Sequence, residues 1–251
     1  MLEPWVYVAL TLVAGVAGFI DSIAGGGGLL IIPALLFAGI NPLMALGTNK
    51  LQSVFGTAMA LRNYWRSGLV KWKPNRATAA MAFAGALAGA LVVNLIGSGP
   101  LKLIIPILLF TSAIYVLLSP RMTDEDAHQR LSRLGYMPVA GAVGFYDGFF
   151  GPGAGTFYTT SLVALRGYGL TRATALAKLV NLASALATLL LFAAAGHILW
   201  LLGLCMAAGA MIGGWIGSHS ALRFGARLIR PLLVTTSIAL TTRLLWSYFS
   251  D

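Results

Sequence analysis

The chain contains two copies of one pattern, and the copies agree at ionisable residues that lie within apolar sequence. Asp21 lies in GFIDSIAGGGG, and Asp147 lies in GFYDGFFGPGAG, 126 positions later. Lys50 in TNKLQS is matched by Lys178 in LAKLVN at a shift of 128. An ionised side chain inside a bilayer costs about 2.5 kcal/mol or more, so a residue that stays there is a functional candidate. The duplication therefore predicts a pseudo-symmetric membrane protein with matched ionisable groups.

The composition supports a membrane location. Of the 251 residues, 58% are hydrophobic and 10% are charged, whereas soluble domains carry about 25% charged residues. This excludes a disordered chain and argues against a nucleic-acid binder, although the net charge is +10. The single cysteine, Cys205, excludes a disulfide framework and a thiolate metal site.

Apolar segments recur in the same order in both halves. A helix needs about 20 residues to cross the hydrocarbon layer, and the last three segments of each half reach that length. The first two segments of each half are shorter and are separated by a glycine-rich break after the aspartate, which is typical of a re-entrant hairpin or of two short spans. The sequence thus predicts an all-α integral membrane protein with about 8 to 10 spans. The segments are 5–20, 29–40, 43–61, 77–96 and 101–118, then 136–145, 156–165, 171–195, 198–218 and 228–248.

The distribution of basic residues predicts the orientation of the two halves. The loop at 62–76 is rich in Lys and Arg, whereas its counterpart at 193–200 has none. Because basic loops favour the cytoplasm, this alternation predicts two repeats of inverted topology, with both termini extracytoplasmic in the cell inner membrane. The predicted division is an N-terminal repeat over 1–118, a cytoplasmic linker over 119–135 and a C-terminal repeat over 136–251.

Two other sequence features have a functional and a structural interpretation. The acidic cluster Asp124, Glu125 and Asp126 with His128 could suggest a metal site, but a solvated linker is the interpretation favoured here. The glycine stripes, Gly85-xxx-Gly89 and Gly209-xxx-Gly213-xxx-Gly217, predict close helix packing.

The glycine-rich breaks have three interpretations. A nucleotide-binding loop is excluded because no Gly-Lys-Ser/Thr follows. Backbone amides at the start of a half-helix could attract an anion, or the glycines could form a tight turn between helices. The residues concerned are Gly25, Gly26, Gly27 and Gly28 in the first half, and Gly151, Gly153 and Gly155 in the second.

Each lysine begins a polar stripe on its helix. Asn49, Gln52, Ser53 and Thr57 accompany Lys50, while Asn181, Ser184 and Thr188 accompany Lys178. Spacings of three and four place such side chains on neighbouring helix faces, which would line a pathway. The alternative for Lys50 is a side chain that snorkels to the membrane surface. Asp21 and Asp147 could pair with the lysines, mark helix ends, or take up and release protons.

The segments GFIDSIAGGGGLLIIPALLFAGINPLMALGTNK and GFYDGFFGPGAGTF resemble the TauE/SafE family of sulfite and sulfonate exporters. The resemblance covers nearly the whole chain and implies an inner-membrane carrier of organosulfur anions. By matching motif it places Asp21, Gly25 to Gly28, Thr48, Asn49 and Lys50 in one half-site, and Asp147, Gly151, Gly153, Gly155, Lys178 and Asn181 in the other. The second half has Leu176 and Ala177 in place of Thr-Asn, so the half-sites cannot contribute equally.

These features together predict a secondary transporter of small sulfur-containing anions, proton-linked and working by alternating access. Lys50, Lys178 and the glycine-loop amides would attract the anion, with Asn49, Ser53 and Asn181 as hydrogen-bond donors, and Asp21 and Asp147 would couple protons or seal gates. The alternatives are an anion channel and a carrier of a non-sulfur organic anion. No nucleophile–base pair indicates an enzyme, and neither a cofactor nor a metal is predicted. The expected partners are the substrate anion, a coupling proton and the lipid bilayer, and the sequence is compatible with a homo-oligomer.

Overall fold

The computed structural model describes residues 2–117, 123–126 and 128–225. Over these residues the chain is all-helical, as predicted, with no strand. Helices α1, α4, α8 and α9 are long and apolar enough to cross a membrane, judged by length and composition. The predicted final segment, 228–248, lies outside the described residues. The helices are α1 (Pro4–Ala24), α2 (Gly28–Phe37), α3 (Pro42–Arg66), α4 (Trp72–Ile96), α5 (Ser98–Leu117), α6 (Arg133–Phe149), α7 (Ala154–Arg166), α8 (Leu170–Ala194) and α9 (Trp200–Phe224).

The helix boundaries repeat along the chain. Helices α3 and α4 begin 128 positions before α8 and α9, and all four contain 25 residues. Asn41 caps α3 by accepting a hydrogen bond from the Leu43 amide, and Pro42 occupies the first turn, where its missing N–H costs nothing. The sequence duplication is therefore also a duplication of helix positions.

Helix α1 is longer than the apolar run 5–20 suggests. The helix continues through Asp21 and ends where Gly25 adopts a left-handed conformation with φ 84°. Its 21 residues are enough to cross the hydrocarbon layer. The expectation that both of the first segments are short is therefore wrong for α1 and holds for the 10-residue α2. The apolar run 5–20 stops at the carboxylate of Asp21, but the helix continues past this residue.

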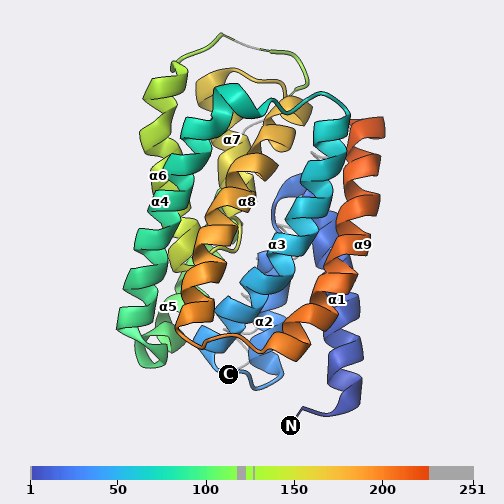
Figure 1. Cartoon of the computed structure of the whole chain (residues 1–251), viewed down its shortest axis with the longest axis vertical. Helices are drawn as coiled ribbons and strands as arrows, with labels where there is room; N and C mark the ends of the chain where they lie inside the picture. Colours follow the sequence, from blue (N-terminus) through green and yellow to red (C-terminus); the bar gives the residue numbers. More distant parts are fainter. Residues whose placement is uncertain (1, 118–122, 127, 226–251) are drawn as a thin grey trace.

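Helices α1 and α2 form one helical hairpin and helices α6 and α7 form another, and the two hairpins enter the bundle from opposite ends. In Figure 1, α1 rises from the end that carries the N-terminus and α2 returns to that end, whereas α6 and α7 form the same arrangement from the other end. Helices α3 and α8 likewise run in opposite directions. These directions agree with the predicted inverted repeat. The relation between the two complete halves stays a prediction.

Helices of different halves pack against each other through glycines. A Cβ atom at Gly85 or Gly89 of α4 would collide with the backbone of α6, and one at Gly213 of α9 would collide with the backbone of α1. Gly209 and Gly217 make equally close approaches to α1. The glycine stripes therefore have the packing role predicted for them, and they hold the first helix of each half against the fourth helix of the other.

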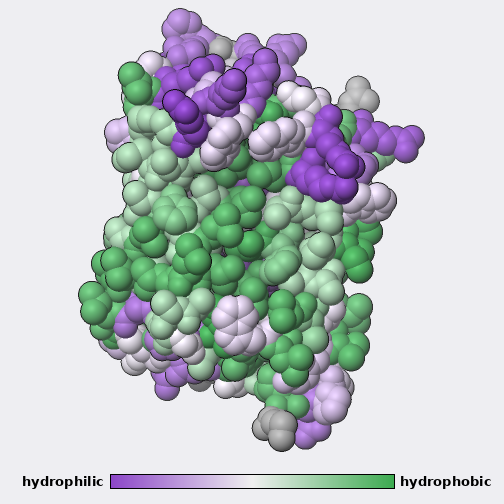
Figure 2. All heavy atoms as spheres, viewed as in Figure 1, coloured by the Kyte–Doolittle hydropathy of each residue, from purple (hydrophilic) through white to green (hydrophobic). Residues whose placement is uncertain are grey.

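The surface separates into an apolar band and a polar end. Figure 2 shows hydrophobic residues around the middle of the molecule and hydrophilic residues gathered at the top, where α3 ends and α4 begins. We call this the linker end, because residues 123–126 and 128–132 and the loop before α8 also lie there. Exposed large apolar residues in the band include Leu12 (67% exposed), Leu103 (72%) and Leu190 (61%), as expected of a surface that faces lipid.

The acidic part of the linker caps α8. The amide of Thr171 donates to Asp124 Oδ1 at 2.8 Å, and the amide of Gly169 donates to Asp126 Oδ1 at 2.7 Å. Carboxylates at a helix N-terminus satisfy free amides and the helix dipole together. Two members of the acidic cluster thus anchor the linker to the helix that carries Lys178.

Candidate functional site

The four duplicated ionisable residues form two ion pairs, and each pair joins the two halves. Lys50 Nζ lies 2.6 Å from Asp147 Oδ1, and Lys178 Nζ lies 2.9 Å from Asp21 Oδ2. Each lysine therefore contacts the aspartate of the opposite half. Of the three interpretations left open for the aspartates, pairing with the lysines is the one that the structure shows.

The first pair is completely buried. The exposed fractions of the side chains of Lys50 and Asp147 are 4% and 3%. Lys50 is the ninth residue of α3, about 12 Å along the helix axis from its start. It turns inward to the other half, so the interpretation that it snorkels to the membrane surface is wrong.

Ser184 completes the environment of Asp147. Its hydroxyl donates to Asp147 Oδ2 at 2.6 Å, while Lys50 donates to Oδ1. Both carboxylate oxygens are thus bound to a donor, one from each half. Ser184 was part of the polar stripe in the sequence but not among the predicted site residues, because its position on α8 does not reveal that α6 lies opposite.

The second pair is more open. Lys178 donates to the backbone carbonyl of Asp21 and to its carboxylate, and its own exposed fraction is 1%. The side chain of Asp21, however, is 20% exposed. The Gly27 amide donates to Asp21 Oδ1 over a long 3.4 Å. Both pairs therefore join a lysine of one half to an aspartate of the other, but they differ in their access to solvent.

The two glycine-rich breaks meet at the centre of the bundle. A Cβ atom at Gly25 would collide with the backbone of Gly155 and Thr156, and Gly28 lies against Pro152. The hydroxyl of Thr156 donates to the carbonyl of Ala24 at 2.8 Å. The glycines therefore form tight turns between helices, which is one of the two interpretations that the sequence left open for them.

Several predicted site residues are placed around this contact. Gly151 lies directly beside the Lys50 ammonium, so that a side chain there would displace it. Gly153 adopts φ 87° and precedes α7, while Gly26 is buried, and a Cβ there would make only an ordinary contact, 3.8 Å from Leu29 Cδ1. Of the glycine amides, that of Gly27 donates to Asp21 Oδ1, and those of Gly25 and Gly151 donate to the carbonyls of Asp21 and Tyr146. Anion binding by the other amides stays a prediction.

The TNK motif does not act as one unit. Thr48 Oγ1 accepts a hydrogen bond from the Leu199 amide at 3.1 Å, just before α9, and so supports the turn between α8 and α9. Asn49 accepts from Gln52 Nε2 at 2.9 Å on its own helix. Asn181 is buried and Ser53 is half-buried. The structure therefore brings Lys50 to the centre and takes Thr48 away from it.

One buried hydroxyl near the first pair was not predicted. Tyr158 of α7 is fully buried beside Asp147 and Ser184, and its OH has no hydrogen bond of normal geometry among the described residues. A buried hydroxyl without a partner is costly, so it marks a position where a further polar group would be stabilised. The aromatic run TFYTT carries no sequence signal for this role.

The first ion pair is shielded in this conformation. Hollows of about 310 to 650 Å³ lie at both ends of the bundle, among them two at the linker end and one beside residues 198–202 at the opposite end. The apposed glycine turns fill the space between the halves at the centre. The pathway that the polar side chains beside Lys50 and Lys178 are expected to line stays a prediction.

Comparison with known proteins assigns this architecture to a family. The family model described as Sulfite exporter TauE/SafE matches residues 10–244. The chain is 46% identical over 237 residues to the Probable membrane transporter protein ORF9 of Sinorhizobium sp, covering 94% of this chain and 91% of that protein. It is 44% identical over 247 residues to the Probable membrane transporter protein YfcA of Escherichia coli strain K12, covering 98% and 92%.

A more distant relative also matches over most of its length. The Probable membrane transporter protein YunE of Bacillus subtilis is 24% identical over 238 residues, which cover 84% of this chain and 87% of that protein. No solved structure shows significant similarity to the chain. A match over nearly the whole sequence, together with apolar spanning helices and the predicted motifs, confirms the resemblance: the chain belongs to the TauE/SafE family and is a multi-pass membrane transporter, not an enzyme.

Proposed function

We propose that the protein is a proton-linked secondary transporter of small sulfur-containing anions, such as sulfite, sulfoacetate or related sulfonates. The family description supports the sulfur anion. The observation that carries the mechanism is the reciprocal pairing of Lys50 with Asp147 and of Lys178 with Asp21 across the two halves.

The charge balance of the centre links the anion to a proton. Two lysines and two aspartates neutralise one another, so an additional anion would leave an uncompensated negative charge in a buried place. If one aspartate takes up a proton, its lysine is released and the site gains one positive charge. A substrate anion then replaces the carboxylate as the partner of that lysine. Proton and anion therefore bind together.

The exposure of the two pairs suggests the order of events. Asp21 is 20% exposed and its donors Lys178 and the Gly27 amide lie 2.9 and 3.4 Å away, whereas Asp147 is buried and is bound by Lys50 and Ser184 at 2.6 Å each. The Asp21–Lys178 pair is therefore the first to take up a proton and to open. Tyr158, whose hydroxyl has no hydrogen-bond partner among the described residues, would donate to the anion when Asp147 moves. Because the pairs join the halves, their alternate opening would expose the centre to one side and then to the other.

The test is uptake into proteoliposomes that contain the purified full-length protein. We expect saturable uptake of labelled sulfite or sulfoacetate that depends on an imposed pH gradient, with inhibition by other short sulfonates. Acetate at the same concentration serves as the control competitor and should have little effect. Saturable uptake of acetate in place of the sulfur anions would refute the proposed substrate class, and uptake that ignores the pH gradient would refute proton coupling.

Counterflow separates a carrier from the alternative of an anion channel. In a carrier, unlabelled anion loaded inside the vesicles accelerates the entry of labelled anion, because the loaded site returns faster. A channel gives no such acceleration. We expect counterflow in the wild type and none in protein-free vesicles.

A further inference from the structure

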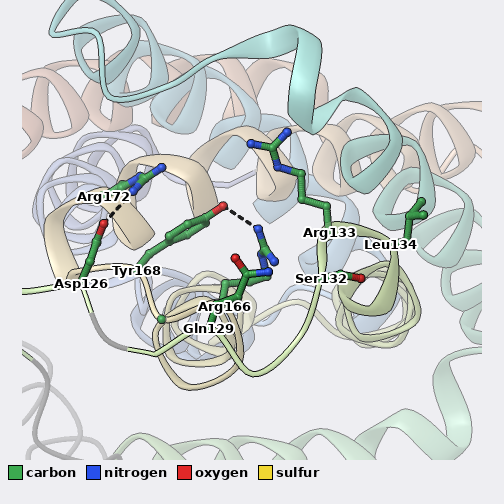
Figure 3. Close-up of a pocket in the computed structure, with 9 residues that line it drawn as sticks. Asp126, Gln129, Ser132, Arg133, Leu134, Arg166, Tyr168 and Arg172 are labelled. Atoms are coloured by element: carbon green, nitrogen blue, oxygen red, sulfur yellow. Dashed lines mark hydrogen bonds and ion pairs between the residues drawn. The ribbon is translucent and has the colours of Figure 1, made fainter.

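A second basic site lies at the linker end, separate from the central ion pairs. A hollow of about 650 Å³ is formed by Asp126, Gln129 and Ser132 of the linker, the start of α6, the end of α7, the loop 167–169 and the first turn of α8. Figure 3 shows its side chains, with Arg166 from the end of α7, Tyr168 from the loop and Arg172 from the first turn of α8, and with Arg133 and Leu134 from the start of α6. None of these residues belongs to the sites predicted from the sequence.

The hollow has an excess of positive charge. Arg133, Arg166 and Arg172 line it together with one carboxylate, that of Asp126. This carboxylate accepts from Arg172 at 2.8 Å and from the Gly169 amide at 2.7 Å, so both of its oxygens are occupied. Arg133 is exposed and has no ion pair among residues 2–117, 123–126 and 128–225. At least one guanidinium is therefore available to a ligand.

The other groups are held in place. Arg166 is only 5% exposed, and it donates to the carbonyl of Leu131 and, at 2.9 Å, to the hydroxyl of Tyr168. Arg172 lies over the ring of Tyr168, 4.3 Å from its centroid. A guanidinium fixed in this way loses little conformational entropy on binding, so these two groups are already positioned to bind a ligand.

A neighbouring hollow enlarges the site. It has a volume of about 310 Å³, shares Arg133, Tyr168 and Arg172 with the first, and adds Lys71 from the loop before α4. Four cations thus surround a groove that contains one carboxylate, already paired. A singly charged anion would leave most of this charge unbalanced, whereas a phosphate group carries up to two charges and accepts the bidentate hydrogen bonds of guanidinium.

From this geometry we propose that the linker end contains a binding site for a phosphate-bearing ligand, either a phospholipid headgroup or a soluble phosphorylated compound. The phosphate lies between Arg133 and the Arg166–Tyr168–Arg172 group. A bound ligand bridges the start of α6, the end of α7 and the first turn of α8. Since α8 carries Lys178 two turns further on, occupancy stiffens the helix that holds the more open ion pair. This site does not depend on which anion the centre transports.

Arg133→Gln tests the site, and Arg76→Gln is its matched control. Both residues are exposed arginines near the linker end, but only Arg133 lines the hollows. Neither substitution breaks a salt bridge within the described residues, so both variants should fold. Full-length protein in nanodiscs of phosphatidylcholine is titrated with inorganic pyrophosphate. We expect Arg133→Gln to weaken its affinity about tenfold or more, and Arg76→Gln to leave it within about twofold.

A lipid arm distinguishes the two sources of phosphate. The same proteins are placed in nanodiscs that contain phosphatidate, and the lipid retained on the protein is measured by native mass spectrometry. Retention that falls in Arg133→Gln but not in Arg76→Gln, without pyrophosphate binding, identifies a headgroup site, and the reverse pattern identifies a soluble ligand. The proposal is overturned if the wild type binds neither, or if both variants lose binding equally.

Discussion

At the residue scale, each central lysine is balanced by a carboxylate from the other half of the chain. Replacement of Lys50 by Ala removes the cation and leaves Asp147 buried with Ser184 as its remaining hydrogen-bond donor. Breaking a buried pair in this way costs about 3–5 kcal/mol, whereas replacing both partners costs much less. We therefore expect Lys50→Ala to lower the melting temperature in detergent, and Lys50→Ala with Asp147→Leu to restore most of it.

The same pair of variants separates stability from function. The double variant folds without the ammonium that attracts the anion, so its uptake should remain abolished although its melting temperature recovers. Full uptake by the double variant would remove Lys50 and Asp147 from the transport mechanism. Reconstituted protein is measured at equal density, so that lower expression of the single variant does not mimic lost transport.

Asp21 offers a test of proton coupling. Asp21→Asn keeps the shape of the side chain but fixes it in a neutral state, so Lys178 permanently lacks a carboxylate to balance its charge. We expect uptake in this variant to lose its dependence on an imposed pH gradient while exchange of anion for anion continues. Asp126→Asn, which alters an exposed ion pair at the linker end, is the control and should keep the dependence. A full pH-gradient response in Asp21→Asn would show that the proton binds elsewhere.

Some of these residues could be found from sequence and others could not. Asp21, Asp147, Lys50 and Lys178 stand out because charge is rare and duplicated in an apolar chain. The sequence does not reveal that each lysine pairs with the aspartate of the other half, because a helical pattern shows which face is polar but not which helix that face contacts. Thr48 was grouped with Lys50 through the TNK motif, yet residues two apart in a helix point about 200° apart, and Thr48 supports the start of α9 instead.

At the element scale, the contact of the two hairpins depends on glycines. Gly155 lies in the first turn of α7, and a Cβ there would lie 2.8 Å from the Cα of Gly25. We expect Gly155→Ala to push the hairpins apart and to reduce uptake at least tenfold, because a barrier rise of 1.4 kcal/mol already has that effect. Gly99→Ala is the control, since nothing lies within 4 Å of a Cβ at Gly99. Uptake rates of both variants are compared in proteoliposomes, and equal rates would contradict the role of this contact.

The elements also show where sequence patterns reach their limit. The long helices were predictable from apolar length, but α3 continues to Arg66 and α1 continues through Asp21, beyond the apolar runs. Backbone hydrogen bonds extend a helix wherever side chains permit it, whereas hydropathy marks only the part suited to lipid. The glycine breaks were correctly placed as breaks, but the fact that they contact each other required the structure.

At the scale of the whole molecule, most Lys and Arg residues of the described ranges gather at the linker end. The last turn of α3, the first turn of α4 and the loop before α8 bring their Lys and Arg residues to the linker end, and Figure 2 shows the resulting polar cap. Basic segments stay in the cytoplasm because translocating them is unfavourable. The linker end should therefore face the cytoplasm, with the N-terminal end of α1 on the opposite side.

Cysteine labelling in intact cells tests this orientation, since the chain has a single cysteine that can be replaced. In a Cys205→Ser background, Glu3→Cys lies at the exposed start of α1 and Arg76→Cys lies at the exposed start of α4. A membrane-impermeant maleimide should label Glu3→Cys in intact spheroplasts and Arg76→Cys only after the membrane is permeabilised. The opposite pattern would place the linker outside, and with it the phosphate site, which would then be reached only by extracellular ligands or by lipids of the outer leaflet. Labelling of both positions in intact spheroplasts would mean that the chain inserts in two orientations.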